Sequence, residues 1–394
     1  MDLFLLSMPW LAVGLFMALC FRNPRGLPPE ASWGEGEAPF VSIIVPARNE
    51  EANIGECVSS LAALDYPAFE LLVVDDESSD RTAEIVEGLS NGSASAVRLI
   101  KGSPLPDGWF GKPWACWQGA GTARGDLLLF TDADTVHAPG LLSQAVRGLR
   151  EEEADVFTLI GRQVMGSFWE QLLQPQFFML LAARFPRAGT QRKPHQWRHA
   201  IANGQYLLFR REVYEASGGH RAVAGEVVED MRLAQLLVRG GWKLVVRGTE
   251  GLQTRMYRSL GDLVEGWSKN VATAAQQSTA PWLLPVIMPL SMLVGVTLWL
   301  LPPALLTWAL VTGNQGVPLA WGAMTTGLGV LIWVRATVLM KGNPLFGLIF
   351  PLGSLFGGYI FLKSWWRGTR IQWKGRTYLL PQRVRTYPPA PRGS

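Results

Sequence analysis

The chain has 394 residues, of which 48% are hydrophobic and only 17% charged, a low charged fraction for a purely soluble protein. Its length leaves room for a core domain of roughly 230 residues together with membrane segments. No Asp or Glu follows Glu265, so residues 1–265 carry 25 − 32 = −7 and the remainder carries +11. An acid-free, apolar and basic C-terminal part is typical of a membrane-embedded segment and argues against nucleic-acid binding. The three cysteines are too few and too scattered for a disulfide framework or a zinc site.

The N-terminal segment from Leu3 to Phe21 is an almost uncharged apolar run of about the length that spans a bilayer. No basic residue precedes it and no small-residue cleavage site is evident, which favours a membrane anchor over residues 1–22 rather than a cleaved signal peptide. Arg22 and Arg25 follow at once, and the positive-inside rule then places the next part of the chain in the cytoplasm. Residues 23–39, rich in Pro, Gly and Glu, are expected to form a linker.

The globular domain is expected to extend over residues 40–270, and its first half repeats a strand–loop–helix unit. VSIIVPARNEEANIGECVSSLAAL predicts a buried strand, a loop at Pro46 to Asn49, and a helix whose apolar face holds Ile54, Cys57, Val58 and Leu61. FELLVVDDESSDRT predicts a second strand, ending in Asp75-Asp76, and a helix from Thr82. AVRLI predicts a third strand, followed by a Gly/Pro/Trp-rich loop and a helix from Pro113 to Ala123. Strands that alternate with helices predict a doubly wound, mostly parallel α/β sheet.

The segment from Leu127 to Thr135, LLLFTDADT, carries the strongest single indication of chemistry. Its four apolar residues predict a buried parallel strand, and Asp132-Ala133-Asp134 follows at the C-terminal end, where open α/β sheets bind ligands. Two carboxylates one residue apart suit a divalent cation that bridges to a diphosphate, because hard cations prefer oxygen ligands. The alternative is a capped turn from strand to helix, since Asp and Thr are common turn and N-cap residues.

Several segments, in order along the chain, resemble the family 2 glycosyltransferases of the GT-A fold. They cover residues 40–250 and read VSIIVPARNEEANI, VVDDESSDRT, TDADT, NGQYLLFRREVYEASGGH and EDMRLAQLLVRGGWKL. The flanking apolar segments, GWFGKPWACWQGA, RMYRSLGDLVEGWSKN and WKGRTY resemble a narrower group, the hopanoid-associated and carotenoid glycosyltransferases, with the ceramide glucosyltransferases more distant. The resemblance implies a GT-A fold and a nucleotide-sugar donor.

The resemblance also implies which residues bind the donor. The end of the first strand would cradle the nucleoside through Pro46, Ala47, Arg48 and Glu50. Asp75 or Asp76 would accept hydrogen bonds from the base or the ribose; the alternative for Asp76 is a turn carboxylate that caps the following loop. Lys112 would reach a phosphate, with a plain surface lysine as the alternative. Asp132 and Asp134, on either side of Ala133, would hold Mg²⁺ or Mn²⁺, with Asp134 as the surer ligand.

The acidic pair Glu229-Asp230 opens a predicted helix, MRLAQLLVRGG. In the family pattern the Asp of this pair takes the proton from the acceptor hydroxyl, so Asp230 is the expected general base, with Glu229 in support. Adjacent carboxylates raise each other's affinity for a proton through like-charge repulsion. The alternative is that the two acids only stabilise the helix N-terminus.

A further motif bears on processivity. Processive family members carry Q/R-x-x-R-W, in which the Arg lies on the diphosphate and the Trp lines the acceptor channel. This chain has Arg255, Arg258 and then Ser259, which disfavours a polymer synthase, although Trp267 offers a spatial substitute. Of the four histidines, His195 and His199 lie in a basic loop without an acidic neighbour and are expected to be surface residues.

The segment Ser167 to Arg187 is apolar and aromatic, is interrupted by Pro175 and is too polar at its start to span a bilayer comfortably. It is expected to form an interfacial helix that presents a lipid acceptor; a buried core helix is the alternative. The candidate acceptor residues are Trp169, Phe177, Phe178 and Trp267.

Membrane helices are expected over residues 281–365. The first span, 282–311, is broken at Pro302-Pro303, the second covers 318–340, and a third apolar run extends from Pro344 to Leu362. Three crossings here would put the basic tail, residues 366–394, outside the cell, against the positive-inside rule. The third run is therefore expected to be re-entrant or interfacial.

These patterns together predict an inverting, metal-dependent enzyme that moves a sugar from a UDP-sugar to a hydroxyl of a membrane lipid. The acceptor would be a carotenoid, hopanoid, sphingolipid-like lipid or glycerolipid, and the catalytic domain would face the cytoplasm at the inner membrane. A processive polysaccharide synthase is the runner-up. A non-catalytic membrane scaffold is disfavoured, because Asp132, Asp134 and Asp230 are all present.

Overall fold

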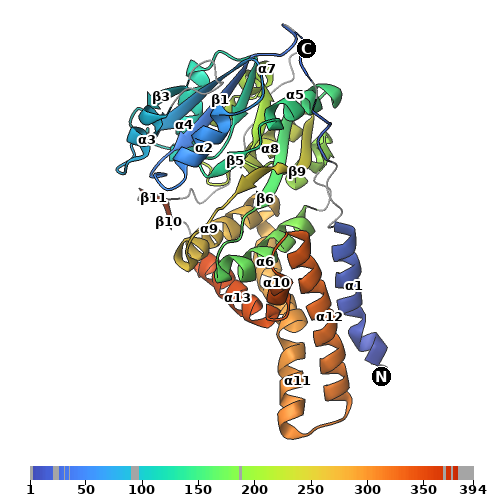
Figure 1. The fold of residues 1–394 in the computed structure, drawn as a ribbon. Coiled ribbons are helices and arrows are strands. Elements are labelled where there is room, and N and C mark those ends of the chain that lie inside the picture. The colour runs from blue at the N-terminus through green and yellow to red at the C-terminus, as the bar shows by residue number, and fades with distance from the viewer. Residues whose placement is uncertain are drawn as a thin grey trace. The chain divides into compact units, whose positions relative to one another are not determined.

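The computed structural model describes residues 3–20, 26–30, 32–34, 36–89, 97–185, 189–366, 370–373 and 376–379 (Figure 1). The chain divides into two compact units. The sheet unit comprises Asn23–Val164, Ala188–Met256 and Thr369–Ser394, and the helical unit comprises Met1–Arg22, Met165–Arg187 and Tyr257–Gly368. Each unit is therefore built from separate stretches of the sequence.

The first half of the sheet unit is the predicted parallel α/β fold. Strands β1 (Val41–Ala47), β2 (Phe69–Asp75), β3 (Val97–Lys101) and β4 (Leu127–Phe130) pair in the order β3-β2-β1-β4, all in parallel. Helices α2 (Ile54–Ala62), α3 (Thr82–Gly88) and α4 (Gly111–Thr122) lie between them in the chain. The expected apolar face of α2 is confirmed, because Ile54, Cys57, Val58 and Leu61 are all buried.

The second half of the sheet is mixed in direction. Strand β8 (Leu207–Arg210) runs antiparallel between β4 and β6 (Val156–Gln163), and β6 pairs in parallel with β9 (Leu244–Thr254). The short strands β5 (Thr135–His137) and β7 (Thr190–Gln191) both pair antiparallel with β9. Helices α5 (Leu141–Glu151), α7 (Arg211–Ala216) and α8 (Glu229–Arg239) and the 3-10 turns η1 (Pro194–His199) and η2 (Gly219–Val223) complete this half. The predicted mostly parallel α/β class is confirmed.

The sheet has a hydrophobic core on each face, which explains why its central strands are mostly apolar. Successive side chains of a strand point to opposite faces, so Ile43 joins one core cluster and Ile44 the other. The first cluster contains residues of α2 and α5, whereas the second contains residues of α4 and α8. A sheet covered on both faces leaves its strand ends as the place for polar side chains.

The helical unit contains α1 (Leu3–Cys20), α6 (Phe168–Arg184), α9 (Leu260–Ser278), η3 (Pro281–Leu283), α10 (Leu284–Trp299), α11 (Leu301–Thr312), α12 (Val317–Leu339), η4 (Pro344–Gly347) and α13 (Phe350–Trp366). Within the described residues, two helical stretches are long and apolar enough to cross a membrane, 284–312 and 317–339. They match two predicted spans and indicate association with a membrane. Figure 1 shows α11 and α12 side by side.

The expected break at Pro302-Pro303 is present, because one helix ends at Trp299 and the next begins at Leu301. The prolines occupy the first turn of α11, where their missing N–H groups cost nothing. In α1 the apolar stretch Leu6–Leu19 is shorter than a full span, and Arg22 and Arg25 lie outside the described residues. The path of the third apolar run stays a prediction; it forms η4 and then the 17-residue α13.

The boundaries of the units differ from the predicted domains in three places. Residues 165–187 and the stretch from Tyr257 belong with the membrane-type helices, whereas they were expected inside the catalytic domain. The tail from Thr369 belongs with the sheet unit, where β10 (Arg370–Trp373) and β11 (Arg376–Leu379) form an antiparallel hairpin. Apolar composition alone did not show to which of the two units these segments belong.

Helix α6 packs inside its own unit. It begins with a capping box, in which Ser167 Oγ accepts from Glu170 N and a Glu170 carboxylate oxygen accepts from Ser167 N, and it continues through Pro175. Phe177 is only 3% exposed and stacks on Trp267, with ring centroids 4.5 Å apart. The expectation that Phe177 faces lipid instead of filling a core is therefore wrong: aromatic stacking within the unit buries it.

The buried position of Phe177 leads to a stability prediction. Phe177→Ser should destabilise the protein by about 3–5 kcal/mol, the range measured for truncating a buried Phe, because the stacked partner Trp267 loses its contact. Leu180→Ser on the same helix, where the side chain is 58% exposed, should leave the melting temperature in detergent nearly unchanged. Equal melting temperatures for both variants would contradict the packing role of Phe177.

Candidate active site

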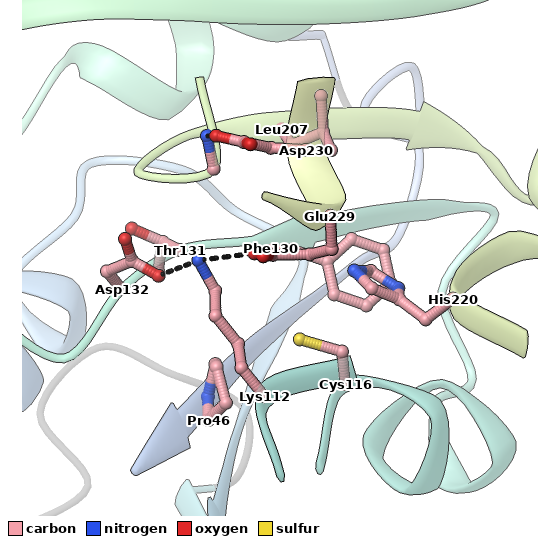
Figure 2. A pocket seen from close by; sticks show the side chains of 11 residues that line it. Pro46, Lys112, Cys116, Phe130, Thr131, Asp132, Leu207, His220, Glu229 and Asp230 are labelled. Atoms are coloured by element: carbon pink, nitrogen blue, oxygen red, sulfur yellow. Dashed lines mark hydrogen bonds and ion pairs between the residues drawn. The ribbon is translucent and has the colours of Figure 1, made fainter. Parts of the chain in front are cut away.

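Polar side chains from distant parts of the chain meet where β1 and β4 end and α8 begins. They line a pocket formed by Pro46, Lys112, Cys116, Phe130, Thr131, Asp132, Gly204, Leu207, His220, Glu229 and Asp230 (Figure 2). Five of the residues predicted from the sequence, Pro46, Lys112, Asp132, Glu229 and Asp230, are among them. The pocket therefore joins the expected metal segment to the expected general base.

Lys112, in the first turn of α4, links these two groups. Its Nζ lies 2.7 Å from Asp132 Oδ1 and 2.7 Å from Glu229 Oε1, so the ammonium group stands between the two carboxylates in Figure 2. Burial alone would lower the pKa of Lys112, but the charges of Asp132, Glu229 and Asp230 outweigh it and hold the pKa well above its ordinary value. The plain-surface-lysine alternative is wrong.

The aspartates after β4 occupy a tight turn that leads into β5, so the alternative of a strand-to-helix turn is also wrong. Thr135 Oγ1 donates to the backbone oxygen of Asp132, at 2.7 Å, and fixes this turn. Asp134 Oδ1 is buried without a partner among the described residues. Burial, followed by the charges of Asp132 and Glu50, raises the pKa of Asp134 to about 8.

This arrangement fits a divalent cation bound jointly by protein and ligand. A buried oxygen without a partner on Asp134, next to a second carboxylate, costs free energy unless a cation or a proton satisfies it. In the part of the chain that the structure describes, no cluster of three or more His, Cys, Asp or Glu side chains is placed to hold a metal. Hard cations take six or more oxygen ligands, so most of them would have to come from a bound diphosphate and water.

The acidic pair begins α8 as expected, and its two members have opposite environments. Asp230 Oδ2 accepts from Gly204 N at 2.8 Å, and Oδ1 accepts from Met231 N at 2.7 Å. Burial, followed by the charge of Glu229, raises the pKa of Asp230 to about 6. Burial also acts on Glu229, but Lys112 outweighs it and lowers the pKa of Glu229. Environments that push two carboxyl pKa values apart are typical of acid–base sites.

Gly204 brings the chain close enough for the contact with Asp230. A Cβ at this position would lie 2.9 Å from Lys112 Nζ and 3.2 Å from Asp230 Oδ2, so a side chain would push directly into the charged cluster. Stabilisation of the helix N-terminus, the alternative role of the acidic pair, explains why Asp230 accepts from Met231 N but not why it accepts from Gly204 N. Gly204 belongs to the NGQ segment, whose role the sequence did not reveal.

The ends of β1 and β2 form the region predicted to bind the nucleoside. Asp76 N donates to Ala47 O at 2.8 Å, and the Arg48 guanidinium donates to the backbone oxygens of Asp76 and Glu77. Oδ1 of Asp75 and Oδ1 of Asp76 are buried without partners among the described residues, so both are available to a ligand.

Neighbouring side chains settle the alternative for Asp76. It is Asp80 that ties the loop to the start of α3, because its Oδ1 accepts from Thr82 N at 3.0 Å. Glu50 N also donates to Thr82 Oγ1, at 2.8 Å. Asp76 Oδ2 instead pairs with Arg376 on β11, at 2.5 Å. The loop-capping interpretation of Asp76 is therefore wrong. Sequence reasoning missed Arg376, although it lies in the WKGRTY motif.

The other residues predicted from the sequence do not line this pocket. Arg255 follows β9 in the sheet unit, Arg258 is exposed just before α9, and their donor-binding roles stay predictions. Ser259, at the position of the motif's Trp, caps α9 by accepting from Asp262 N at 3.1 Å. His195 and His199 are exposed, as expected for surface residues. Trp169 contacts Phe356, and Phe178 packs edge-on against Trp267.

A mostly parallel sheet, whose strand ends present an Asp-x-Asp segment opposite an acidic helix start, gives the sheet unit a GT-A-like fold. A mannosyltransferase from Pyrobaculum calidifontis, solved in complex with GDP-mannose and Mn²⁺, has this fold with a TM-score of 0.53, at 18% identity over 93% of this chain and 96% of its own.

Residues 42–218 match the family described as Glycosyl transferase family 2, so the chain contains a domain of that family and is a glycosyltransferase. It is similar to the 4,4'-diaponeurosporenoate glycosyltransferase of Staphylococcus aureus strain MRSA252, with 27% identity over 86% of this chain and 88% of that protein. The Staphylococcus haemolyticus strain JCSC1435 protein of the same description is 28% identical over 64% of this chain and 66% of its own.

Proposed function

We propose that this glycosyltransferase moves a sugar from a UDP-sugar to a hydroxyl of a membrane lipid, with inversion and with a divalent metal ion. One observation carries the proposal: Lys112 ties Asp132 of the Asp-x-Asp turn to Glu229, the neighbour of Asp230, within one pocket. The group that would hold the diphosphate and the group that would accept the proton are thus brought together.

This placement of the two groups supports a single displacement at the anomeric carbon of the sugar. The acceptor oxygen attacks the anomeric carbon as the bond to the diphosphate oxygen breaks, and the hydroxyl proton passes to Asp230. A single in-line displacement puts nucleophile and leaving group on opposite faces of the sugar, so the anomeric configuration inverts. Asp230 is suited to the proton because its pKa of about 6 lets it be ionised at neutral pH and still bind a proton.

The donor would lie along the ends of β1, β2 and β4. Within the described part of the chain, Asp75 and Asp76 each present a buried oxygen without a partner, suited to N–H and O–H donors of a base and ribose. Asp134, with Asp132, would hold Mg²⁺ or Mn²⁺, which when bound neutralises charge that develops on the leaving diphosphate. Lys112 adds a second positive charge at the same place.

A lipid acceptor is supported by composition and by the relatives. The two apolar helical stretches support association with a membrane, and the similar staphylococcal proteins are described as glycosyltransferases of 4,4'-diaponeurosporenoate, a carotenoid acid. Trp169 and Phe178 are half-buried candidates for acceptor contact on α6, and buried Phe177 and Trp267 would act by supporting that helix. The processive alternative stays disfavoured, because Ser259 caps a helix where processive enzymes carry Trp.

Calorimetry with the purified protein in detergent tests the donor. UDP in the presence of Mn²⁺ should bind, and its binding should weaken at least tenfold when Asp76 is replaced by Asn, because a ligand N–H or O–H would then meet a weaker, neutral acceptor. GDP, the nucleotide of the archaeal mannosyltransferase, is the control. Tighter binding of GDP than of UDP would contradict the choice of donor.

Thiol labelling of intact spheroplasts tests the orientation. A UDP-sugar donor requires the active site to face the cytoplasm. If the apolar stretch 284–312 then crosses the bilayer once, residue 315 is carried to the opposite face of the membrane. With an impermeant reagent, Gln315→Cys should react in intact spheroplasts, whereas exposed Ser59→Cys on α2 should react only after lysis. Labelling of Ser59→Cys before lysis would overturn the cytoplasmic placement.

A further inference from the structure

The C-terminal hairpin β10–β11 contacts the loop that follows β2, 300 residues earlier in the chain. Arg376 on β11 places Nη1 2.5 Å from Asp76 Oδ2 and Nη2 2.5 Å from Glu77 Oε2. The Arg376 side chain is 15% exposed and that of Asp76 is 3% exposed, so this is a largely buried pair and not a surface contact. The proposed reaction does not involve this ion pair.

The loop that Arg376 contacts is held from two sides. Arg48 donates to the backbone oxygens of Asp76 and Glu77, whereas Arg376 pairs with their side chains. Glu77 has a φ of 56°, in the left-handed region that residues with a Cβ rarely adopt, so the loop needs such contacts to keep this conformation. Two guanidinium groups therefore fix the position of the Asp76 carboxylate.

Arg376 occupies only one of the two carboxylate oxygens of Asp76. Oδ2 carries the ion pair, whereas Oδ1 is buried and has no partner among the described residues. Asp75 Oδ1, next to it in the chain, is in the same condition. A nucleoside can thus bind to Oδ1 without displacing the arginine, and a guanidinium that pairs with one oxygen restricts the direction of the other.

We propose that Arg376 is a positioning residue for the donor: it holds the Asp76 carboxylate turned so that Oδ1 accepts a hydrogen bond from the nucleoside. The C-terminal hairpin then contributes to binding of the donor. This inference rests on the proposed function, because it requires Asp76 to bind a nucleotide. It assigns a role to WKGRTY that depends on its arginine.

The test is UDP binding by calorimetry with Mn²⁺, together with initial rates of sugar transfer. Arg376→Gln should weaken UDP binding and raise the KM for the donor by tenfold or more, with kcat changed less than threefold. Arg376→Lys keeps the charge but lacks the planar fork that reaches Asp76 and Glu77 through two separate nitrogens, so it should recover part of the loss. Arg147→Gln, which removes a half-exposed pair with Glu151 on α5, is the matched control and should change neither quantity.

A double-mutant cycle separates positioning from general stability. In an Asp76→Asn background, Arg376→Gln should weaken UDP binding less than threefold, because its effect acts through the Asp76 carboxylate. Equal losses in both backgrounds, or tighter binding of UDP by Arg376→Gln, would overturn the inference; the second result would mean that the arginine blocks the site. If wild-type protein binds neither UDP nor GDP, the proposed function fails as well, whereas normal wild-type binding with an unaffected variant sinks this inference alone.

Discussion

Asp230→Asn should reduce the rate of sugar transfer by about 10²–10⁴, the usual contribution of a general base, while donor binding stays nearly unchanged. Asn has the same size, and its side-chain oxygen still accepts from Gly204 N, so the start of α8 keeps its main contact. The amide cannot take the proton of the acceptor hydroxyl. Comparison of kcat for wild type and variant, with UDP affinity measured by calorimetry, tests the assignment.

Two further observations belong to the same test. Since Asp230 works in its ionised form and its pKa is raised to about 6, kcat/KM should rise with pH through about 6 and be lost below it. Glu229→Gln weakens the pairing with Lys112 but leaves Asp230 in place, so it should retain more activity than Asp230→Asn. An inactive Glu229→Gln enzyme beside an active Asp230→Asn enzyme would show that the other carboxylate is the base.

Asp134→Asn should nearly abolish transfer without lowering the melting temperature. The substitution replaces a buried carboxyl group, whose Oδ1 has no partner among the described residues, by an amide of equal size, so the fold loses no hydrogen bond made by Oδ1 while the metal site loses its surer ligand. EDTA should inactivate the wild type in the same way, and added Mg²⁺ or Mn²⁺ should restore its activity but not that of the variant. The measurement is transfer rate after chelation and metal titration.

Cys57→Ala is the control for the metal experiment. Cys57 on α2, whose Sγ donates to Asp132 O at 3.6 Å, supports the Asp-x-Asp turn without offering it a charge, because burial raises the pKa of its thiol to about 12. Cys57→Ala should therefore reduce activity only modestly and leave the metal requirement intact. Full activity of the wild type in EDTA would refute the metal role of Asp134 and Asp132.

The sheet was predictable where its strands are buried on both faces. β1, β2 and β4 are mostly apolar runs that end in or are followed by polar residues, and this local pattern places Asp75, Asp76 and Asp132 at strand ends. The antiparallel insertion of β8 between β4 and β6 was not predictable, because strand pairing depends on contacts between segments far apart in the chain. The same limit applies to β10 and β11.

The candidate site was predicted as separate motifs and not as an arrangement. Asp132 and Glu229 were expected from their motifs, yet nothing local showed that one lysine at position 112 contacts both. The pairing of Arg376 with Asp76 spans 300 residues and leaves no local pattern beyond the WKGRTY motif itself. Phe177 was misjudged because an apolar, aromatic helix has the same composition whether its partner is lipid or Trp267.

The most direct test of the central claim is transfer of a labelled sugar to lipid. Membranes that contain the wild-type protein are incubated with a panel of radiolabelled UDP-sugars, with GDP-mannose in parallel, and the lipids are extracted and separated. We expect label from one UDP-sugar in a discrete lipid band, dependent on divalent metal and absent with Asp230→Asn. Label that stays in water-soluble or polymeric material, or a lipid band of equal intensity with Asp230→Asn, would contradict the account.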